Sequence, residues 1–375
     1  KEIDNSRPEP YWVLATVYRD TLFTATKGKF TNKEEGEAAF SAIEGKLFTV
    51  TKVEKKNGKE TPPSLYDLTS LQVDCNRKFG FSAEMTLNLI QQLYEQKLTT
   101  YPRVDTTFLP DDVYPKCPQI MNGLFQTRVA GQAPYAELVK PLGGKPLPKS
   151  KKVFDSSKVT DHHAIIPTGV PPQNLPDMMR QVFDLIARRF IAVFYPDCKY
   201  AQTTVLGEVE ATPTAPEGAS IDPSKNAIEF KVTGRTILDP GWRTVYAKDT
   251  PTEDDESNVA PMGAEGGASG EATERTLPPF EKGESGDNKP TLTEKMTTPP
   301  PYYTEATLLR AMETAGKLVD DEELRRAMKE NGIGRPSTRA AIIETLFKRH
   351  YIRKERKRLV ATPTGIELID LIREE

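Results

Sequence analysis

Residues 98–107 read LTTYPRVDTT and follow a helical pattern that ends near Lys97. In an extended segment the side chains at i and i+2 point the same way, so Tyr101 and Arg103 would share a face. A phenol is a weak nucleophile at neutral pH because its pKa is about 10. A neighbouring guanidinium can bind a phosphate and stabilise the charge that develops on it. The pair therefore suits attack on a phosphodiester that leaves a phosphotyrosine; the alternative is a buried tyrosine beside a surface arginine.

Two further motifs lie later in the chain. Residues 161–168 read DHHAIIPT and hold two of the three histidines, a side chain suited to phosphate binding and proton transfer near neutral pH. Residues 332–338 read GIGRPST and would begin a helix, because proline suits a first helical turn. A helix N-terminus offers free N–H groups and a positive dipole to a phosphate. The alternative is an ordinary N-cap formed by Ser337, and the two glycines alone make neither a dinucleotide loop nor a P-loop.

These motifs, together with LYDLTSLQ (65–72) and NRKFGFSA (76–83), resemble those of type IA DNA topoisomerases in the same order, and the topoisomerase III branch fits best. The resemblance implies a multidomain α+β fold, the gate or arch of that family. In it, a β-rich arch domain is interrupted by a helical domain bearing the catalytic tyrosine and is followed by a winged-helix-like helical domain. The implied activity is transient single-strand cleavage through a 5′-phosphotyrosine, strand passage and religation without ATP.

The resemblance also implies roles for individual residues. Tyr101 would be the nucleophile and Arg103 the phosphate clamp, while His162 would bind the scissile-region phosphate or help proton transfer. A basic run at 348–358 could follow a DNA backbone or be simply solvated. For Gln72 and Arg77 the alternative is a solvated helix face. The candidate contacts to single-stranded DNA are Gln72, Arg77, His163, Arg335, Ser337 and Thr338.

No metal site is predicted in this chain. Two adjacent histidines point apart, and no cysteine or third histidine lies near them in sequence. The resembling family holds Mg²⁺ with acidic residues of a Toprim domain. Here the acidic clusters lie in a low-complexity stretch (253–256) and at the start of a helix (320–323), where acids favour the dipole. We therefore expect a fragment of a longer polypeptide, inactive alone. Its partner would be the Toprim domain of the same polypeptide, and the full-length enzyme would bind Mg²⁺ through ligands outside this chain.

Composition shifts predict four segments. Residues 1–69 contain β-branched and aromatic runs and would form the first segment of the β arch. Residues 70–197 would form the helical domain, with Ser82 as the N-cap of one of its helices. Residues 198–300 would return to the arch, and 301–375 would form the winged-helix-like domain. Within the second arch segment, 249–288 is rich in Gly, Pro, Ser and acid and is interpreted as an acidic flexible insert, although the apolar residues at 277–280 could belong to the arch.

The overall composition is compatible with a DNA-binding protein. The 375 residues carry a net charge of −3, but 249–287 holds eleven acidic against two basic residues, which leaves +6 on the remainder. Three cysteines without a CxxC pair indicate neither a zinc ribbon nor a disulfide framework. No apolar run approaches the roughly 20 residues of a membrane span, and no signal peptide is evident. We expect a cytoplasmic, nucleoid-associated protein with no membrane partner.

Two other classes of protein compete with this interpretation. A non-catalytic winged-helix DNA-binding or scaffold protein would explain residues 304–375 but would leave Tyr101 and the 161–168 motif without a role. Reverse gyrase shares the motifs but needs an ATP-driven helicase domain, of which this sequence shows no trace. A covalent adduct between the full-length protein and DNA separates the enzyme from the binding module.

Overall fold

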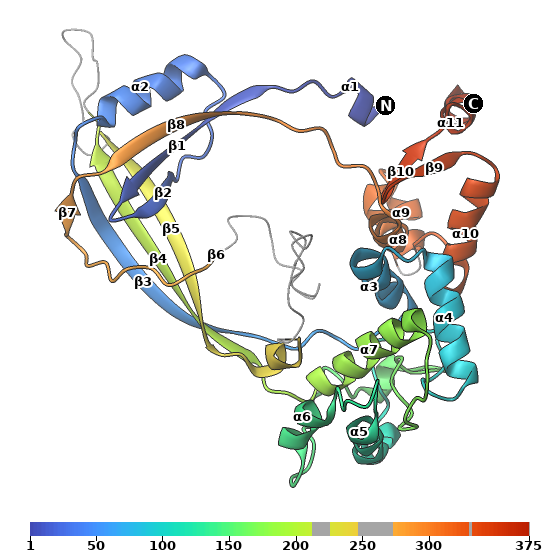
Figure 1. The fold of residues 1–375 in the computed structure, drawn as a ribbon. Coiled ribbons are helices and arrows are strands. Elements are labelled where there is room, and N and C mark those ends of the chain that lie inside the picture. Colours follow the sequence, from blue (N-terminus) through green and yellow to red (C-terminus); the bar gives the residue numbers. More distant parts are fainter. Residues whose placement is uncertain (212–225, 247–272, 330–331, 375) are drawn as a thin grey trace. The chain divides into compact units, whose positions relative to one another are not determined.

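The structure is a computed structural model that describes residues 1–211, 226–246, 273–329 and 332–374. These residues combine helices with a curled antiparallel sheet, which confirms the predicted α+β class (Figure 1). They form two compact units, each built from three stretches of chain. The described residues of 1–60, 198–240 and 266–301 make up the first, and the described residues of 61–197, 241–265 and 302–375 make up the second.

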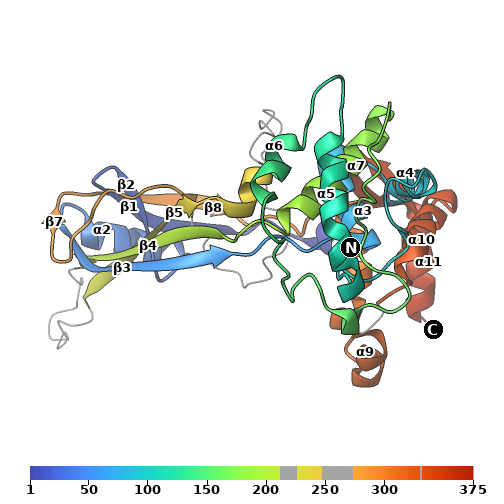
Figure 2. The same ribbon diagram turned by 90° about the horizontal axis from the view of Figure 1, so that it is seen from below.

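The first unit is built on one sheet. In the described residues it has eight strands in the order β7-β3-β4-β5-β2-β1-β8, with β6 pairing on β5. Helix α2 (Lys33–Ile43) packs against β1, β4 and β8 (Figures 1 and 2), and α1 (Glu2–Asn5) is a single turn. The strands are β1 (Pro10–Tyr18), β2 (Thr21–Ala25), β3 (Phe48–Glu60), β4 (Cys198–Glu210), β5 (Ala227–Asp239), β6 (Thr273–Glu274), β7 (Ser285–Gly286) and β8 (Lys289–Met296).

Local sequence explains why these strands form and where the core lies. The tight turn between β1 and β2 places Arg19 and Asp20 at φ of 48° and 55°, the left-handed pair that matches the twist of a two-residue hairpin. Alternate residues of the strands point inward and bring aromatic rings together. Tyr18 stacks on Phe48 at 4.7 Å, and Phe23 packs on Phe48 at 4.7 Å. The first unit is therefore held by an aromatic core.

The interpretation of 249–288 as a flexible insert is wrong for its last part. Phe280 is 7% exposed, and its ring centroid lies 5.6 Å from that of Phe23. The Arg19 guanidinium lies 4.9 Å from the centroid of the Phe280 ring. Leu277 packs on the same core, and β7 pairs with β3. The acidic composition suggested a flexible segment, but two apolar residues, Leu277 and Phe280, are enough to hold it because they pack on the core. Residues 247–272 lie outside the described residues.

The second unit is mainly helical. Its described α-helices are α3 (Leu68–Phe79), α4 (Ala83–Glu95), α5 (Cys117–Gln126), α6 (Ala136–Val139), α7 (Asp177–Ala192), α8 (Glu305–Glu313), α9 (Glu322–Lys329), α10 (Pro336–Lys348) and α11 (Pro363–Glu374). A two-stranded hairpin joins α10 to α11 and consists of β9 (Ile352–Glu355) and β10 (Arg358–Ala361). No helix in the described part of the chain is both long and apolar enough to cross a bilayer.

Side-chain caps fix where α3 and α4 begin. The Asp67 carboxylate accepts from the Ser70 N–H at 2.8 Å, while the Asp67 N–H donates to the Ser70 hydroxyl at 3.1 Å. Gly80 then ends α3 at φ 72°, in the left-handed region. Ser82 accepts from the Met85 N–H at 3.0 Å and begins α4, as the sequence predicts. The two helices are therefore separated by a sharp, fully capped turn.

A buried arginine ties α7 to α3. Arg189 is 6% exposed and donates to the Ser64 carbonyl at 2.8 Å, the Tyr66 hydroxyl at 3.0 Å and the Asp74 carboxylate at 3.0 Å. Burial raises the pKa of Tyr66 well above its ordinary value, so the phenol stays neutral. Because the charge is paired and hydrogen-bonded, its burial is tolerated.

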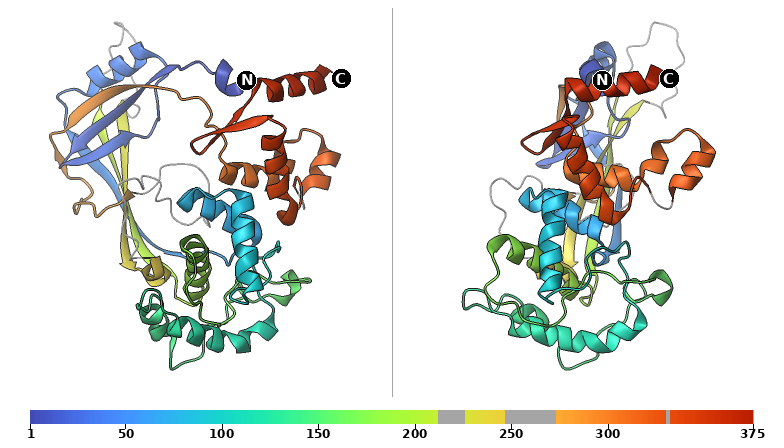
Figure 3. Two further views of the ribbon diagram at one scale, coloured as in Figure 1. Left: turned by 45° about the vertical axis from the view of Figure 1, so that its right-hand side comes forward. Right: turned by 90° about the vertical axis from the view of Figure 1, so that its right-hand side faces the viewer.

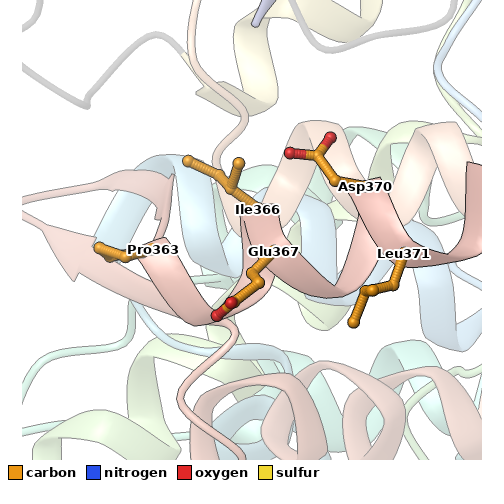
Figure 4. A pocket seen from close by; sticks show the side chains of 5 residues that line it. All are labelled: Pro363, Ile366, Glu367, Asp370 and Leu371. Carbon is orange, nitrogen blue, oxygen red and sulfur yellow. The ribbon is translucent and has the colours of Figure 1, made fainter.

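The C-terminal segment does not stand apart from the helical one. Residues 302–375 belong to the same compact unit as 61–197, where the sequence predicted a separate winged-helix-like domain from 301. The reason is packing: α8 lies against α3, and α10 lies against α4. The predicted order of helix, basic hairpin and helix is present as α10, β9–β10 and α11 (Figure 3). A shallow hollow of about 490 Å³ runs along α11, lined by Pro363, Ile366, Glu367, Asp370 and Leu371 (Figure 4).

Candidate active site

The loop that carries Tyr101 is held by the histidine motif. The Thr100 N–H donates to the Ile166 carbonyl at 3.0 Å, and the Thr168 N–H donates to the Leu98 carbonyl at 3.1 Å. The Thr100 hydroxyl adds two bonds, donating to the Ala164 carbonyl at 3.3 Å and accepting from the Ile166 N–H at 3.0 Å. Two motifs that lie about sixty residues apart in sequence therefore run side by side.

Tyr101 and His162 are in contact. Their ring centroids lie 4.1 Å apart, and the two rings are tilted by 31° from each other. Tyr101 is half-buried, whereas His162 is exposed. The two predicted catalytic residues are thus brought together, with one ring open to a ligand.

His163 faces different surroundings from His162. Its Nδ1 lies 2.7 Å from the Ala164 carbonyl oxygen, so the protonated Nδ1 donates to that oxygen. It lines a polar pocket of about 380 Å³ together with Asp112, Lys116 and Asp161. The two adjacent histidines therefore occupy separate environments, as expected for neighbours in an extended segment.

Arg103 links this loop to the third motif. Its Nη1 donates to the Ser337 carbonyl at 3.3 Å, in the first turn of α10. The chain beside it is anchored, because the Val104 carbonyl accepts from the Leu68 N–H at 3.1 Å at the start of α3. Arg103 is exposed, so its remaining N–H groups can reach a phosphate. All three sequence motifs meet within the second unit.

The start of α10 has the geometry of a capped helix. The Thr338 hydroxyl accepts from the Arg335 N–H at 3.0 Å, and the Thr338 N–H donates to the Arg335 carbonyl at 2.9 Å. Thr338, rather than Ser337, therefore supplies the capping side chain. Gly332 has a φ of 61°, and a Cβ there would lie 2.2 Å from the Met312 carbonyl oxygen, so only glycine fits. Arg335 points into solvent.

One candidate DNA contact is wrong. Gln72 is 0% exposed, and its Nε2 donates to the Ala83 carbonyl at 3.1 Å in the first turn of α4. The side chain is packed between helices and has no free path to a ligand. Arg77, one turn and a half further along α3, is half-buried, and burial lowers the pKa of its guanidinium from the ordinary value. The helical pattern was right, but the polar side chain of Gln72 faces inward.

The sequence motifs did not single out three buried polar residues that join 61–197 to 302–375: Arg339, Glu305 and Asn76. Arg339 is 3% exposed and donates to the Ile333 carbonyl at 3.0 Å and to the Thr69 hydroxyl at 3.1 Å. It therefore fixes the glycine-containing loop before α10 against α3. Burial lowers the pKa of its guanidinium from the ordinary value. The available signal was helical spacing, because Arg339 lies four residues before the buried Ile343.

Glu305 and Asn76 join the same two segments. The Glu305 carboxylate, 1% exposed, accepts from the Ala83 N–H at 3.3 Å and from the Lys354 ammonium at 3.1 Å. The Asn76 carbonyl oxygen accepts from the Ala306 N–H at 3.0 Å. Together with Arg339, these contacts form what we call the polar junction between 61–197 and 302–375. No short motif marks it, because every partner is remote in sequence.

The described residues contain no group of three or more His, Cys, Asp or Glu side chains arranged to hold a metal ion. The donors that Mg²⁺ prefers, several carboxylate and carbonyl oxygens, therefore do not come together in this part of the chain. Tyr101 and His162 bring a phenol and an imidazole into contact, while the Arg103 guanidinium, two residues along the loop, bonds to the first turn of α10. A phenol can act as a nucleophile, an imidazole as a proton acceptor and a guanidinium as a phosphate ligand.

Comparisons with known proteins agree with these motifs. A family model described as DNA topoisomerase matches residues 1–375. DNA topoisomerase 3 of Bacillus subtilis is 34% identical over the whole chain, which covers 48% of that protein. DNA topoisomerase 3 of Bacillus cereus is 35% identical over 92% of the chain and 43% of that protein. The chain thus spans about half the length of the curated relatives it matches.

A solved structure is similar in fold. Full-length topoisomerase I from Thermotoga maritima superposes on the whole chain with a TM-score of 0.66, at 22% identity and over 52% of that protein. The likeness extends from the curled sheet to the helical unit that holds Tyr101, which confirms the predicted gate and arch fold. With the family match over its full length and relatives above 30% identity, the chain belongs to the DNA topoisomerase family, and the predicted resemblance is confirmed.

Proposed function

We propose that this chain provides the cleavage tyrosine and the gate of a type IA topoisomerase of the topoisomerase III branch, acting on single-stranded DNA. The observation that carries the proposal is the contact between the rings of Tyr101 and His162 at 4.1 Å. Arg103, two residues from Tyr101, lies beside the start of α10. A non-catalytic DNA-binding module would need the basic hairpin but not this contact.

The proposed reaction is a transesterification. The Tyr101 oxygen attacks the phosphorus of one DNA strand, and the bond from that phosphorus to the 3′ oxygen of the preceding nucleotide breaks. The strand then keeps its 5′ phosphate on Tyr101, and the freed 3′ hydroxyl reverses the step on religation. One phosphate ester replaces another, so resealing needs no ATP.

Each neighbouring side chain has a proposed part in this step. His162 accepts the phenol proton or binds the scissile-region phosphate, which imidazole can do near neutral pH. Arg103 neutralises charge on the phosphate oxygens as the bond forms. Further proposed contacts to the strand are Arg77, His163, Arg335, Ser337 and Thr338.

Opening of the gate is proposed to occur at the polar junction. The strand attached to Tyr101 would move with residues 61–197, while 302–375 would stay with the rest of the enzyme. The junction suits reversible separation, because Glu305, Asn76 and Arg339 can exchange their present partners for water. Strand passage would take place while the segments are apart.

Mg²⁺ and the Toprim domain would lie outside this chain. Membership of the family is consistent with an enzyme that requires Mg²⁺. The described residues, however, contain no cluster of acidic side chains that could bind the ion. We therefore propose that the metal and its carboxylates belong to another part of the polypeptide and that this chain alone binds DNA without cleaving it. The intact protein would act in the cytoplasm at the nucleoid.

The experiment that tests the proposal replaces Tyr101 in the full-length protein. Tyr101→Phe removes only the nucleophilic oxygen, so the SDS-resistant adduct with a single-stranded oligonucleotide should disappear. Affinity for that oligonucleotide should stay nearly unchanged, because phosphate charge dominates binding. Tyr114→Phe, a phenol of the same unit whose hydroxyl donates to the Leu147 carbonyl, is the matched control and should keep the adduct. An adduct in Tyr101→Phe would show that another residue is the nucleophile.

A further inference from the structure

The end of α4 places a second tyrosine beside Tyr101. The Lys97 N–H donates to the Tyr94 carbonyl at 2.9 Å, and the Leu98 N–H donates to the Leu93 carbonyl at 3.0 Å. Lys97 has a φ of 61°, so the two bonds form the left-handed helix ending known as the Schellman motif. The chain turns back on the helix at this point. Tyr101 therefore returns to the last turn of α4, where Tyr94 lies.

Tyr94 and His162 both contact the ring of Tyr101. The rings of Tyr94 and Tyr101 lie 5.4 Å apart at an interplanar angle of 83°, an edge-to-face pair. The His162 ring is tilted by 31° from that of Tyr101. The ring of Tyr101 thus contacts two other rings at different angles. Tyr94 is itself 37% exposed, and its hydroxyl has no hydrogen bond to any described residue.

We propose that Tyr94 is a positioning residue for the cleavage step. It acts through Tyr101 and does not touch the DNA phosphate. An unrestrained tyrosine samples three χ1 rotamers, and the rotamer of Tyr101 in this structure makes both ring contacts. A nucleophile displaced by about 1 Å can lose roughly a hundredfold in rate. The ring of Tyr94, not its hydroxyl, makes the contact, so a phenylalanine should serve equally well. The proposal rests on the proposed function, since it requires that Tyr101 be the nucleophile.

The test measures single-turnover adduct formation in the full-length protein at saturating single-stranded oligonucleotide. Tyr94→Ala should slow the cleavage rate by about tenfold, because an edge-to-face pair favours one rotamer by a factor of a few to about ten. The dissociation constant for the oligonucleotide should stay within twofold, and the melting temperature should fall by only a few degrees, the size expected for the loss of one ring pair. Tyr94→Phe should restore the full rate. Phe125→Ala, which removes an aromatic ring that is 41% exposed in α5 of the same unit, should change none of these quantities.

The outcomes separate this proposal from the proposed function. An adduct that survives Tyr101→Phe defeats the assignment of the nucleophile itself. If Tyr101→Phe abolishes the adduct but Tyr94→Ala cleaves at the normal rate, only the positioning role is overturned. The same holds if Tyr94→Phe is as slow as Tyr94→Ala, or if Tyr94→Ala weakens DNA binding as much as it slows cleavage. Tyr94→Leu, which keeps bulk at the helix end, should be slow as well and excludes a folding defect as the cause.

Discussion

The two compact units bury different kinds of side chain. The first packs the rings of Tyr18, Phe23 and Phe48 into an aromatic core, and its buried polar residues in the described part of the chain are two threonines. The second buries charge. Every buried charged residue among those described lies there: Arg189, Glu305 and Arg339.

The buried charges fit the proposed opening at the polar junction, whereas the aromatic core of the arch is not proposed to open. Apolar rings have no favourable interaction with water to gain on separation, so exposing that core would cost free energy. A buried carboxylate or guanidinium costs free energy to dehydrate and recovers hydration when exposed. Glu305 and Arg339 therefore hold their segments in one arrangement but oppose separation less than apolar groups of the same area would.

The largest effect should come from breaking the aromatic core. Phe48→Ala removes a ring that is fully buried and contacts both Tyr18 and Phe23. The loss should be about 3–5 kcal/mol of unfolding free energy, because a large cavity remains. Native-state hydrogen exchange should show lost protection in β1 to β5, with α3 and α7 unaffected. Leu47→Ala, at an adjacent residue that is 55% exposed, should stay within about 0.5 kcal/mol. Equal losses in both variants would show that the ring cluster does not stabilise the arch.

A smaller loss, confined to the second unit, should follow from Glu305→Gln. The amide still accepts a hydrogen bond but gives up the charge that binds the Lys354 ammonium and the Ala83 N–H. Hydrogen bonds to charged groups contribute about 1.5–3 kcal/mol, and Lys354 is partly solvated, so a loss near the lower value is expected. Hydrogen exchange at the start of α4 and of α8 reports it. Glu137→Gln, an exposed glutamate of the same unit, should be silent. If protection from hydrogen exchange were lost in the arch strands instead, Glu305 would not stabilise the second unit alone, and the contrast between the two units would be wrong.

The smallest effect concerns pH. Burial raises the pKa of Glu344 above its ordinary value, and the neighbouring carboxylates Glu84 and Glu305 raise it further, while Lys348 opposes them. A folded-state pKa above the unfolded one means that the folded chain binds the proton more tightly. Ionised Glu344 therefore destabilises the folded state at neutral pH, and this penalty is relieved as the pH falls through the raised pKa.

Glu344→Gln should accordingly stabilise the second unit at pH 7 by a few tenths of a kcal/mol, the size of partly exposed charge effects. The gain over the parent should shrink as the pH is lowered toward 4.5, the ordinary glutamate pKa. Melting curves across this range measure it. If the gain in stability grew as the pH fell, the ionised Glu344 carboxylate would not be the group that destabilises the folded state.

Local signals in the sequence were enough to predict elements, motifs and their order. The Ser82 cap, the helix–hairpin–helix order at the C-terminus and the α+β class all follow from short-range patterns. Contacts between segments that are remote in sequence could not be predicted from these patterns. Gln72 was predicted to contact DNA because nothing local shows that α4 begins against it. Phe280 was assigned to an insert because its acidic neighbours dominate the composition, while its partner Phe23 is remote in sequence.

The candidate site shows the same limit. The motifs include Tyr101, Arg103 and His162, but not the ring of Tyr94, which contacts Tyr101, or the guanidinium of Arg339, which bonds to Thr69. Both lie next to a motif without belonging to it. The Tyr94 contact depends on the left-handed turn at Lys97 that ends α4, and the Arg339 contact depends on the packing of α10 against α3. Neither arrangement is evident from a short stretch of residues.

The most direct test of the account is to identify the residue that carries DNA in the trapped adduct. The full-length protein would be incubated with a single-stranded oligonucleotide and Mg²⁺, denatured in SDS, and digested with nuclease and trypsin. The account predicts that mass spectrometry finds the nucleotide on Tyr101, within the tryptic peptide 98–103, LTTYPR. A nucleotide on any other peptide would contradict it.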